Sequence, residues 1–312
     1  MNRYYSLFTY SALVALFLPS CGMAQMNVVS NIEENFEGIE EILVKGGSLE
    51  VNYEGSNKEN DVFLNAYLES NRSDGIEIMY KVEGNRLRVE LKQESRGWGN
   101  TKTKGFISLT GPENMRLDIN NSSGTMFVSN VHSDKIDLGI SSGKIEARGL
   151  SCDEINIQAS SGKFVLEDLN GHLKCKISSG NGHIDGVEGD VTVEASSGSY
   201  MISDVEGLVN ASLSSGNLEL EDIGELGNLR VSSGRIEARN SGLGNHTRFN
   251  GSSGSFTVQT EQDLEDLNFE LSSSSGSLEV GDTKTRKKLS INNDSNHTVT
   301  GSISSGRISI QN

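Results

Sequence analysis

The sequence is poor in proline, tryptophan and cysteine. Its 312 residues include 2 Pro, 1 Trp and 3 Cys, and aromatic residues make up only 6% of the chain. Such a low aromatic content argues against a conventional globular core. The apolar fraction of 34% is nevertheless too high, and too regularly placed, for a disordered chain. A chain of this length has room for one large all-β domain or two ordinary domains.

Basic residues are also scarce. The chain has 27 Lys and Arg against 43 Asp and Glu, so its formal net charge is −16. Binding to phosphate backbones needs a basic surface that releases counterions, so we expect no nucleic-acid partner. An acidic surface mainly favours solubility.

The first residues predict export. Arg3 precedes the apolar run "LFTYSALVALFL" (Leu7 to Leu18), which is too short to span a bilayer and is broken by Pro19. Two processing sites remain open: "GMAQ" fits cleavage before Gln25, and "LPSC" resembles a bacterial lipobox with Cys21 as the lipidated residue. The expected location is an outer-membrane lipoprotein, the periplasm or the cell surface.

Two cysteines remain in the exported chain, Cys152 and Cys175. Export permits a disulfide, but the repeat described below places Cys175 in an inward column and Cys152 at a corner of a neighbouring coil. We therefore predict packing residues rather than a bridge.

The strongest signal is the tripeptide Ser-Ser-Gly, which occurs ten times. The spacings between successive copies are 19, 19, 18, 18, 18, 18, 20, 22 and 30 residues. A period near 18 with β-type composition predicts a solenoid of stacked coils. The ten glycines are Gly124, Gly143, Gly162, Gly180, Gly198, Gly216, Gly234, Gly254, Gly276 and Gly306.

Apolar residues alternate on both sides of each tripeptide, as strands with one buried face do. The sequence therefore predicts an all-β, single-stranded parallel β-helix of about 18–19 residues per coil, with coils stacked in sequence order at roughly 4.8 Å. Examples before the glycine are Leu173, Cys175, Ile177; Val191, Val193, Ala195; examples after it are Phe164, Leu166; Tyr200, Ile202.

The tripeptide itself is interpreted as a structural corner. Glycine tolerates a positive φ there, and the serine pair can hydrogen-bond to the same serines of the next coil. We expect no serine nucleophile.

A weaker column contains Asp168, Asp204 and Asp222. Stacked carboxylates could form a Ca²⁺ ladder, whereas an Asx turn at each far corner needs no ion. The ladder has gaps, so we favour the turn.

Both ends of the array depart from the repeat. Residues 1–24 are the expected signal peptide, 25–115 an N-terminal cap with irregular opening coils, and 116–312 the Ser-Ser-Gly solenoid continuous with it. A separate small β-domain is the alternative for the second segment. Near the other end, Gly281 to Thr298 is interpreted as a corner loop, and such loops often bind ligands.

Four residues are candidates for binding. Arg286, Lys287 and Lys288 could contact an anionic glycan or lipid head group, or form a solvated turn. Trp98, in "ESRGWGN", could stack on a sugar, insert into a membrane surface or cap the solenoid.

Catalytic motifs are missing from the sequence. The five His are dispersed, His172 and His246 share a register position several coils apart, and no HExxH, GxSxG or paired-Cys metal motif is present. We expect no enzyme, no metal and no cofactor. A carbohydrate-binding or polysaccharide-degrading β-helix is the alternative function.

The segments "ILVKGGSLEVNYEG", "LTGPENMRLDI" and "SSGKIEARGL" resemble a bacterial family of proposed adhesins of unknown function, related to the head (GIN) domains of auto-transporter adhesins. The resemblance covers roughly Asn27 to Asn312. It implies an exported or envelope β-helix, expected to be right-handed, with an unknown glycan, protein or envelope surface as partner and no catalytic residues to transfer.

Overall fold

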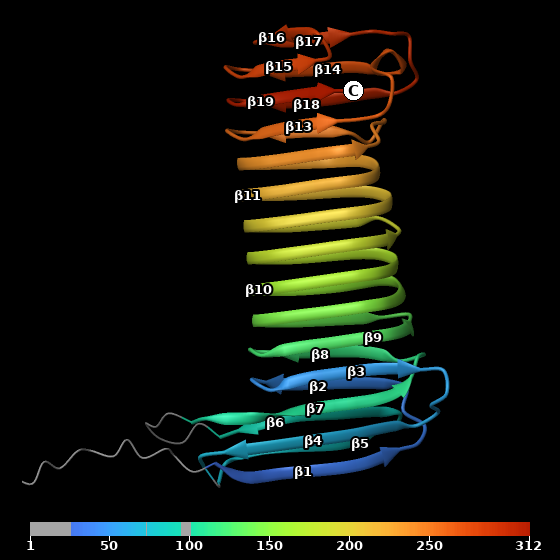
Figure 1. The fold of residues 1–312 in the computed structure, drawn as a ribbon, viewed down its shortest axis with the longest axis vertical. Coiled ribbons are helices and arrows are strands. Elements are labelled where there is room, and N and C mark those ends of the chain that lie inside the picture. Colours follow the sequence, from blue (N-terminus) through green and yellow to red (C-terminus); the bar gives the residue numbers. More distant parts are fainter. Residues whose placement is uncertain (1–25, 73, 95–100) are drawn as a thin grey trace, which may run out of the picture.

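The computed structural model describes residues 26–72, 74–94 and 101–312 and confirms an all-β solenoid (Figure 1). Among these residues there is one short 3₁₀ turn, and no helix is long and apolar enough to cross a membrane. The elements are β1 (Asn27–Phe36), β2 (Glu41–Gly47), β3 (Glu50–Ser56), β4 (Val62–Ser70), β5 (Ile76–Glu83), β6 (Arg86–Gln93), β7 (Thr103–Pro112), β8 (Arg116–Asn121), β9 (Thr125–Ser133), β10 (Ile136–Glu188), β11 (Val191–Ser241), β12 (Arg248–Gly251), β13 (Ser255–Gln259), η1 (Leu264–Asp266), β14 (Asn268–Ser273), β15 (Ser277–Val280), β16 (Thr283–Thr285), β17 (Lys288–Ile291), β18 (Thr298–Ile303) and β19 (Arg307–Gln311).

The long strands β10 and β11 each wind through several coils without a break in pairing (Figure 1). Their parallel register joins Leu173 to Val191 and Gly180 to Gly198, an offset of one 18-residue coil. Each coil therefore has two flat sides. The first face consists of the strand segments before each Ser-Ser-Gly, the second face of those after it, and the apolar rows of both point inward.

The core is one continuous apolar column between the two faces. Its side chains interlock from coil to coil. Phe164 and Tyr200 lie two coils apart, and their rings stack with centroids 6.1 Å apart. Gly182 occupies the same position in the intervening coil, and a Cβ there would lie 1.8 Å from the Phe164 ring. The glycine thus leaves the space that the two large rings share.

Positive φ is found at only six of the ten Ser-Ser-Gly glycines. Gly124, Gly143, Gly180, Gly198, Gly216 and Gly306 have φ between 96° and 144°. The prediction was wrong for Gly162, Gly234, Gly254 and Gly276, which do not adopt that conformation.

The requirement common to the stacked corners is close approach of the backbones. A Cβ on Gly198 would lie 1.9 Å from the Gly180 carbonyl oxygen, and one on Gly234 would lie 2.2 Å from that of Gly216. Even at Gly254 the corresponding distance to the Gly234 oxygen is 2.9 Å. Any side chain would push neighbouring coils apart.

The serine hydroxyls contribute less to the corner than predicted. Contacts between hydroxyls of adjacent coils join Ser161 to Ser179 at 3.3 Å and Ser275 to Ser305 at 3.4 Å. The backbone carries most of the pairing, for example from the Ser142 amide to the Ser122 carbonyl at 2.8 Å. Serine is therefore a small residue whose main chain continues the ladder around the bend.

The far corner, opposite Ser-Ser-Gly, is a column of left-handed residues. It includes the three aspartates of the predicted column, and their gaps are filled by glycine or asparagine. All seven have φ between 49° and 70°, a region that only Gly, Asn and Asp enter readily. The column is Asn130, Gly149, Asp168, Gly186, Asp204, Asp222 and Asn240.

The coils at the C-terminal end do not stack in sequence order, which corrects the prediction. The last coil, β18–β19, lies between β12–β13 and β14–β15, with parallel pairing to both (Figure 1). A Cβ on Gly306 would accordingly meet the Gly254 oxygen at 1.9 Å, and one on Gly276 the Gly306 oxygen at 2.7 Å.

The segment Gly281 to Thr298 is not simply the predicted corner loop. It contains β16 and β17, which pair antiparallel with β15 and β14. These short strands cover the outermost coil, β14–β15, and Lys284, Lys287 and Lys288 lie in or beside them. Short strands and lysines protect a sheet edge from further pairing, so this segment is the C-terminal cap.

The N-terminal strands join the same hydrogen-bonded sheet. The coil β2–β3 pairs in parallel with β6–β7 on one side and with β8–β9 on the other, again out of sequence order. Beyond β6–β7 the pairing becomes antiparallel, through β5 on the first face and through β4 and then β1 on the second. Handedness stays a prediction.

Cys152 and Cys175 are both buried and free, as predicted. Burial raises the pKa of both thiols, most strongly that of Cys175, because the thiolate would lose its hydration. The Cys152 thiol also donates a hydrogen bond to the Glu154 carbonyl at 3.1 Å.

We predict that Gly198→Ala lowers the free energy of unfolding by about 2–4 kcal/mol, because the new Cβ collides with the Gly180 carbonyl and φ there is +136°. The matched control Ser197→Ala should cost no more than about 1 kcal/mol. Urea denaturation followed by far-ultraviolet circular dichroism measures both. Equal effects of the two substitutions would contradict the close-approach explanation.

We predict that both thiols react with a disulfide reagent at pH 8 at least roughly 100-fold more slowly in the folded chain than in urea, because a raised thiol pKa leaves little thiolate and burial blocks access. Absorbance of the released thiolate follows the reaction in a chain that starts at Gln25. Rapid reaction of Cys175 in the folded protein would show that the core opens around it.

Candidate functional site

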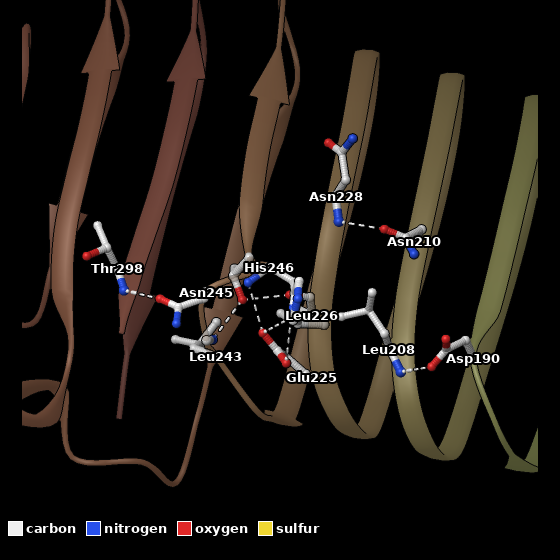
Figure 2. A network of polar contacts seen from close by, with 12 residues as sticks. Asp190, Leu208, Asn210, Glu225, Leu226, Asn228, Leu243, Asn245, His246 and Thr298 are labelled. Atoms are coloured by element: carbon white, nitrogen blue, oxygen red, sulfur yellow. Dashed lines mark hydrogen bonds and ion pairs between the residues drawn. The ribbon is translucent and has the colours of Figure 1, made fainter. Parts of the chain in front are cut away.

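His172 and His246 make polar contacts between adjacent coils. In Figure 2, the Glu225 carboxylate accepts hydrogen bonds from the backbone amide of His246 at 3.1 Å and lies 3.2 Å from its Nδ1. The same figure shows Asp190 accepting from the Leu208 amide at 2.9 Å. Side chains of one coil thus satisfy amides of the next where the chain turns. His172 and His246 do not meet.

The far corner forms a shallow groove of about 860 Å³ that contains the aspartate column. Two of its three carboxylates have protein partners: Asp168 accepts from Arg148 at 2.9 Å, and Asp222 accepts from the side-chain amide of Asn240. Within residues 26–72, 74–94 and 101–312, no three His, Cys, Asp or Glu side chains lie close enough together to hold a metal ion. The column's left-handed backbone explains the aspartates without an ion.

Three of the four predicted binding residues lie in the described part of the chain. Arg286, Lys287 and Lys288 are exposed on the C-terminal cap, and the Lys287 carbonyl accepts a hydrogen bond from the Ser273 amide at 2.8 Å. They lie at the opposite end of the solenoid from β4 and β7 (Figure 1). Trp98 and Cys21 lie outside the described residues.

The structure reveals a different cluster on the outer surface of the second face. Four aromatic side chains project outward from β4, β7 and β9, while the alternate residues of these strands are buried. We call them the outer aromatic patch: Phe63, Tyr67, Phe106 and Phe127. Phe63 is 45% exposed and the others are half-buried. Of the other aromatic residues in the described part of the chain, Tyr80 is 38% exposed and contacts the Phe36 ring edge-on, and the rest lie in the core or pack against it.

Pairing brings this patch together from distant parts of the sequence. Tyr67 lies opposite Phe106, and their rings stack with centroids 6.2 Å apart. Asn52 of β3 lies beside Phe127 on one side and Ser108 on the other. The Tyr67 hydroxyl donates to Glu69 at 2.6 Å, and this hydrogen bond raises the pKa of the phenol.

A hollow of about 430 Å³ opens between Phe106 and Phe127. Its polar lining comes from Glu50, Asn52, Asn65 and Ser108. Asn52 donates to Ser108 at 3.4 Å. Aromatic rings beside amides, a hydroxyl and a carboxylate can hold a ligand, but they supply no nucleophile with an adjacent base.

The sequence does carry a local signal for the patch. In "VFLNAYLES" and "TMFVS" apolar residues occupy both alternating sets of positions, although a strand with one wet face needs only one. That signal marks Phe63, Tyr67 and Phe127 as outward apolar residues. It does not reveal that they converge, because their strands are neighbours only in the folded stack.

Solved structures similar to this chain are described as proposed adhesins or as a proposed lipid-binding protein. A proposed adhesin from Bacteroides fragilis is 14% identical over 90% of this chain and 97% of its own, with a TM-score of 0.39. A proposed adhesin from Parabacteroides merdae is 12% identical over 93% of this chain and 97% of its own, with a TM-score of 0.38. The proposed lipid-binding protein, from Parabacteroides distasonis, is 14% identical (92% and 96%, TM-score 0.37).

No curated protein matches the sequence significantly. A family model, in contrast, covers nearly the whole described solenoid. The model for Toastrack DUF4097 matches residues 39–311, from the residues just before β2 to the end of β19. The chain belongs to the Toastrack DUF4097 family.

Proposed function

We propose that this protein is an exported, non-catalytic component of the bacterial envelope that acts as an adhesin or surface scaffold. The observation that carries the proposal is the stiff solenoid itself, which presents outward side chains on flat, solvent-facing sides. Ten corners separated by nine rises of roughly 4.8 Å span roughly 43 Å before the end strands are added.

The local construction explains why such a rod can hold a surface in place. Backbone hydrogen bonds continue through the corners, and the corner glycines leave no space between adjacent coils. Bending the rod would therefore break backbone pairing or force main-chain contacts below van der Waals distance. The outward positions are free of this constraint and can carry binding residues.

Non-catalytic action is supported by the kinds of groups at the surface. The candidate residues are aromatic rings, amides and separated charges, whereas glycoside hydrolysis needs two carboxyl groups facing one bond. The grooves are open and shallow. Such surfaces favour contact with an extended partner over enclosure of a reacting bond.

We predict saturable binding of the purified chain to envelope fragments from cells that lack the gene, unchanged by EDTA because the aspartate column is structural. Surface plasmon resonance on immobilised fragments measures it at physiological salt. Failure to bind envelope fragments would contradict the proposed function, and release of soluble sugar products from them would contradict a non-catalytic role.

We predict that the exported chain keeps a lipid on Cys21, which would tether the N-terminal end of the rod to the membrane. Metabolic labelling with an alkyne fatty acid should mark the wild-type protein, and Cys21→Ala should abolish the label. An unlabelled wild-type protein whose first residue is Gln25 by mass spectrometry would instead establish cleavage without an anchor.

A further inference from the structure

We infer that the outer aromatic patch and its hollow form a binding site for a neutral saccharide chain. This inference rests on the proposed function and names the ligand class and the face for that contact. The repeat predicts no such site, because three of the four aromatic residues lie on the irregular strands β4 and β7 and only Phe127 lies in a Ser-Ser-Gly coil.

The patch is unusual for this molecule in its location and its exposure. Outward residues along the second face of β10 are mostly charged or polar, for example Lys144, Glu146 and Arg148. The outer aromatic patch instead exposes aromatic ring surface to solvent. Exposed aromatic surface of this kind marks contact sites on soluble proteins.

The polar groups between the aromatic rings indicate which class of ligand binds there. Asn65 is half-buried in the hollow, and its amide makes no side-chain hydrogen bond with another described residue. The exposed Glu50 carboxylate at the rim likewise has no ion-pair partner in the described chain. An amide and a carboxylate together offer two donors and several acceptors, as a ligand rich in hydroxyl groups requires.

A pyranose ring matches both parts of this surface. Its C–H face is apolar and can lie on an aromatic ring, while its equatorial hydroxyls point sideways toward amide and carboxylate groups. The hollow of about 430 Å³ falls in the lower range of small-ligand pockets. It opens onto a flat sheet, so a chain can extend beyond it toward Phe63 and Tyr67.

Charge restricts the ligand further. The outward charged residues on these four strands are Glu50, Glu54, Glu69 and Lys104, three acids against one base. Nucleic acid also stacks on aromatic rings, but it needs a basic groove for its backbone. Polyanionic glycans meet the same repulsion. A neutral saccharide avoids it.

A protein partner fits less well. Stable protein interfaces commonly bury on the order of 800 Å² on each partner around an apolar centre that excludes water. Here amides and a hydroxyl interrupt the aromatic rings at the centre of the patch, in the row Asn65, Ser108, Asn52. Wet polar groups between the rings suit a hydroxylated ligand.

The test is binding of the full exported chain to immobilised hexasaccharides of β-linked glucose, N-acetylglucosamine, mannose and xylose, with polygalacturonate as an acidic probe. We expect saturable binding to at least one neutral hexamer and none to polygalacturonate. Phe106→Ala and Phe127→Ala should each weaken binding by roughly 10-fold or more, as loss of a central aromatic contact does.

Two further variants control for folding and for general surface effects. Phe106→Leu keeps an apolar side chain but loses the ring, so it should still weaken binding while leaving the urea midpoint near wild type. Met201→Ala removes another exposed apolar side chain of the second face, 39% exposed and in β11, and should leave binding unchanged.

Binding that survives both phenylalanine substitutions, or no binding to any neutral hexamer, overturns the inference. Envelope binding measured on the same variants distinguishes failure of the saccharide-site inference from failure of the proposed adhesin or scaffold function. If Phe106→Leu still binds envelope fragments as wild type does, the saccharide site is wrong and the adhesin or scaffold function stands. If wild type binds no envelope fragment, the proposed function itself has failed.

Discussion

The close approach of the main chain at the Ser-Ser-Gly corner is the constraint on which the rest of the structure depends. One coil cannot bury its apolar row alone, so stability comes from stacking, and stacking requires coils to repeat at the spacing of hydrogen-bonded strands. A bend would normally interrupt that spacing. Glycine at the bend lets its Cα approach the carbonyl oxygen of the preceding coil, so pairing continues from one face to the other. The far corner meets the same demand differently, with left-handed Asp, Asn and Gly residues that reverse the chain in a single step.

The coil architecture could be predicted from the sequence because the same pattern recurs in each of the repeats. The period and the inward rows could be predicted from alternation alone, and Cys175 was correctly placed in the core because it occupies an inward position. The reason for glycine was predicted only in part. Positive φ is a property of one residue, whereas the clash that excludes a side chain at Gly234 involves the coil beneath it. Sequence alone could not distinguish a need for positive φ from a need for close approach between coils. Close approach requires glycine even at corners whose φ is not positive.

The order of the coils could not be predicted for a related reason. Units with the same period, the same corner and similar apolar rows can stack on one another in any order, since each offers the same ladder. At both ends of the solenoid, coils stack out of sequence order. The coil β2–β3 is held between β6–β7 and β8–β9, and β18–β19 between β12–β13 and β14–β15. The first and last complete coils are thus paired on both sides. Fraying of the C-terminal strand β19 would have to break two ladders instead of one, whereas the first strand, β1, pairs only with β4.

The candidate binding surface is a consequence of that same rearrangement. Tyr67, Phe106 and Phe127 come from strands separated by tens of residues, and they share one surface because β4, β7, β3 and β9 are neighbours in the stack. In the regular coils every outward position has its equivalent one period away, so a cluster there would require several coils to change together. The irregular end has no such repetition, and a few strands can acquire aromatic residues without disturbing the core. A solenoid of this construction therefore separates its tasks: the repeating coils supply length and stiffness, and the strands that break the repeat can supply recognition.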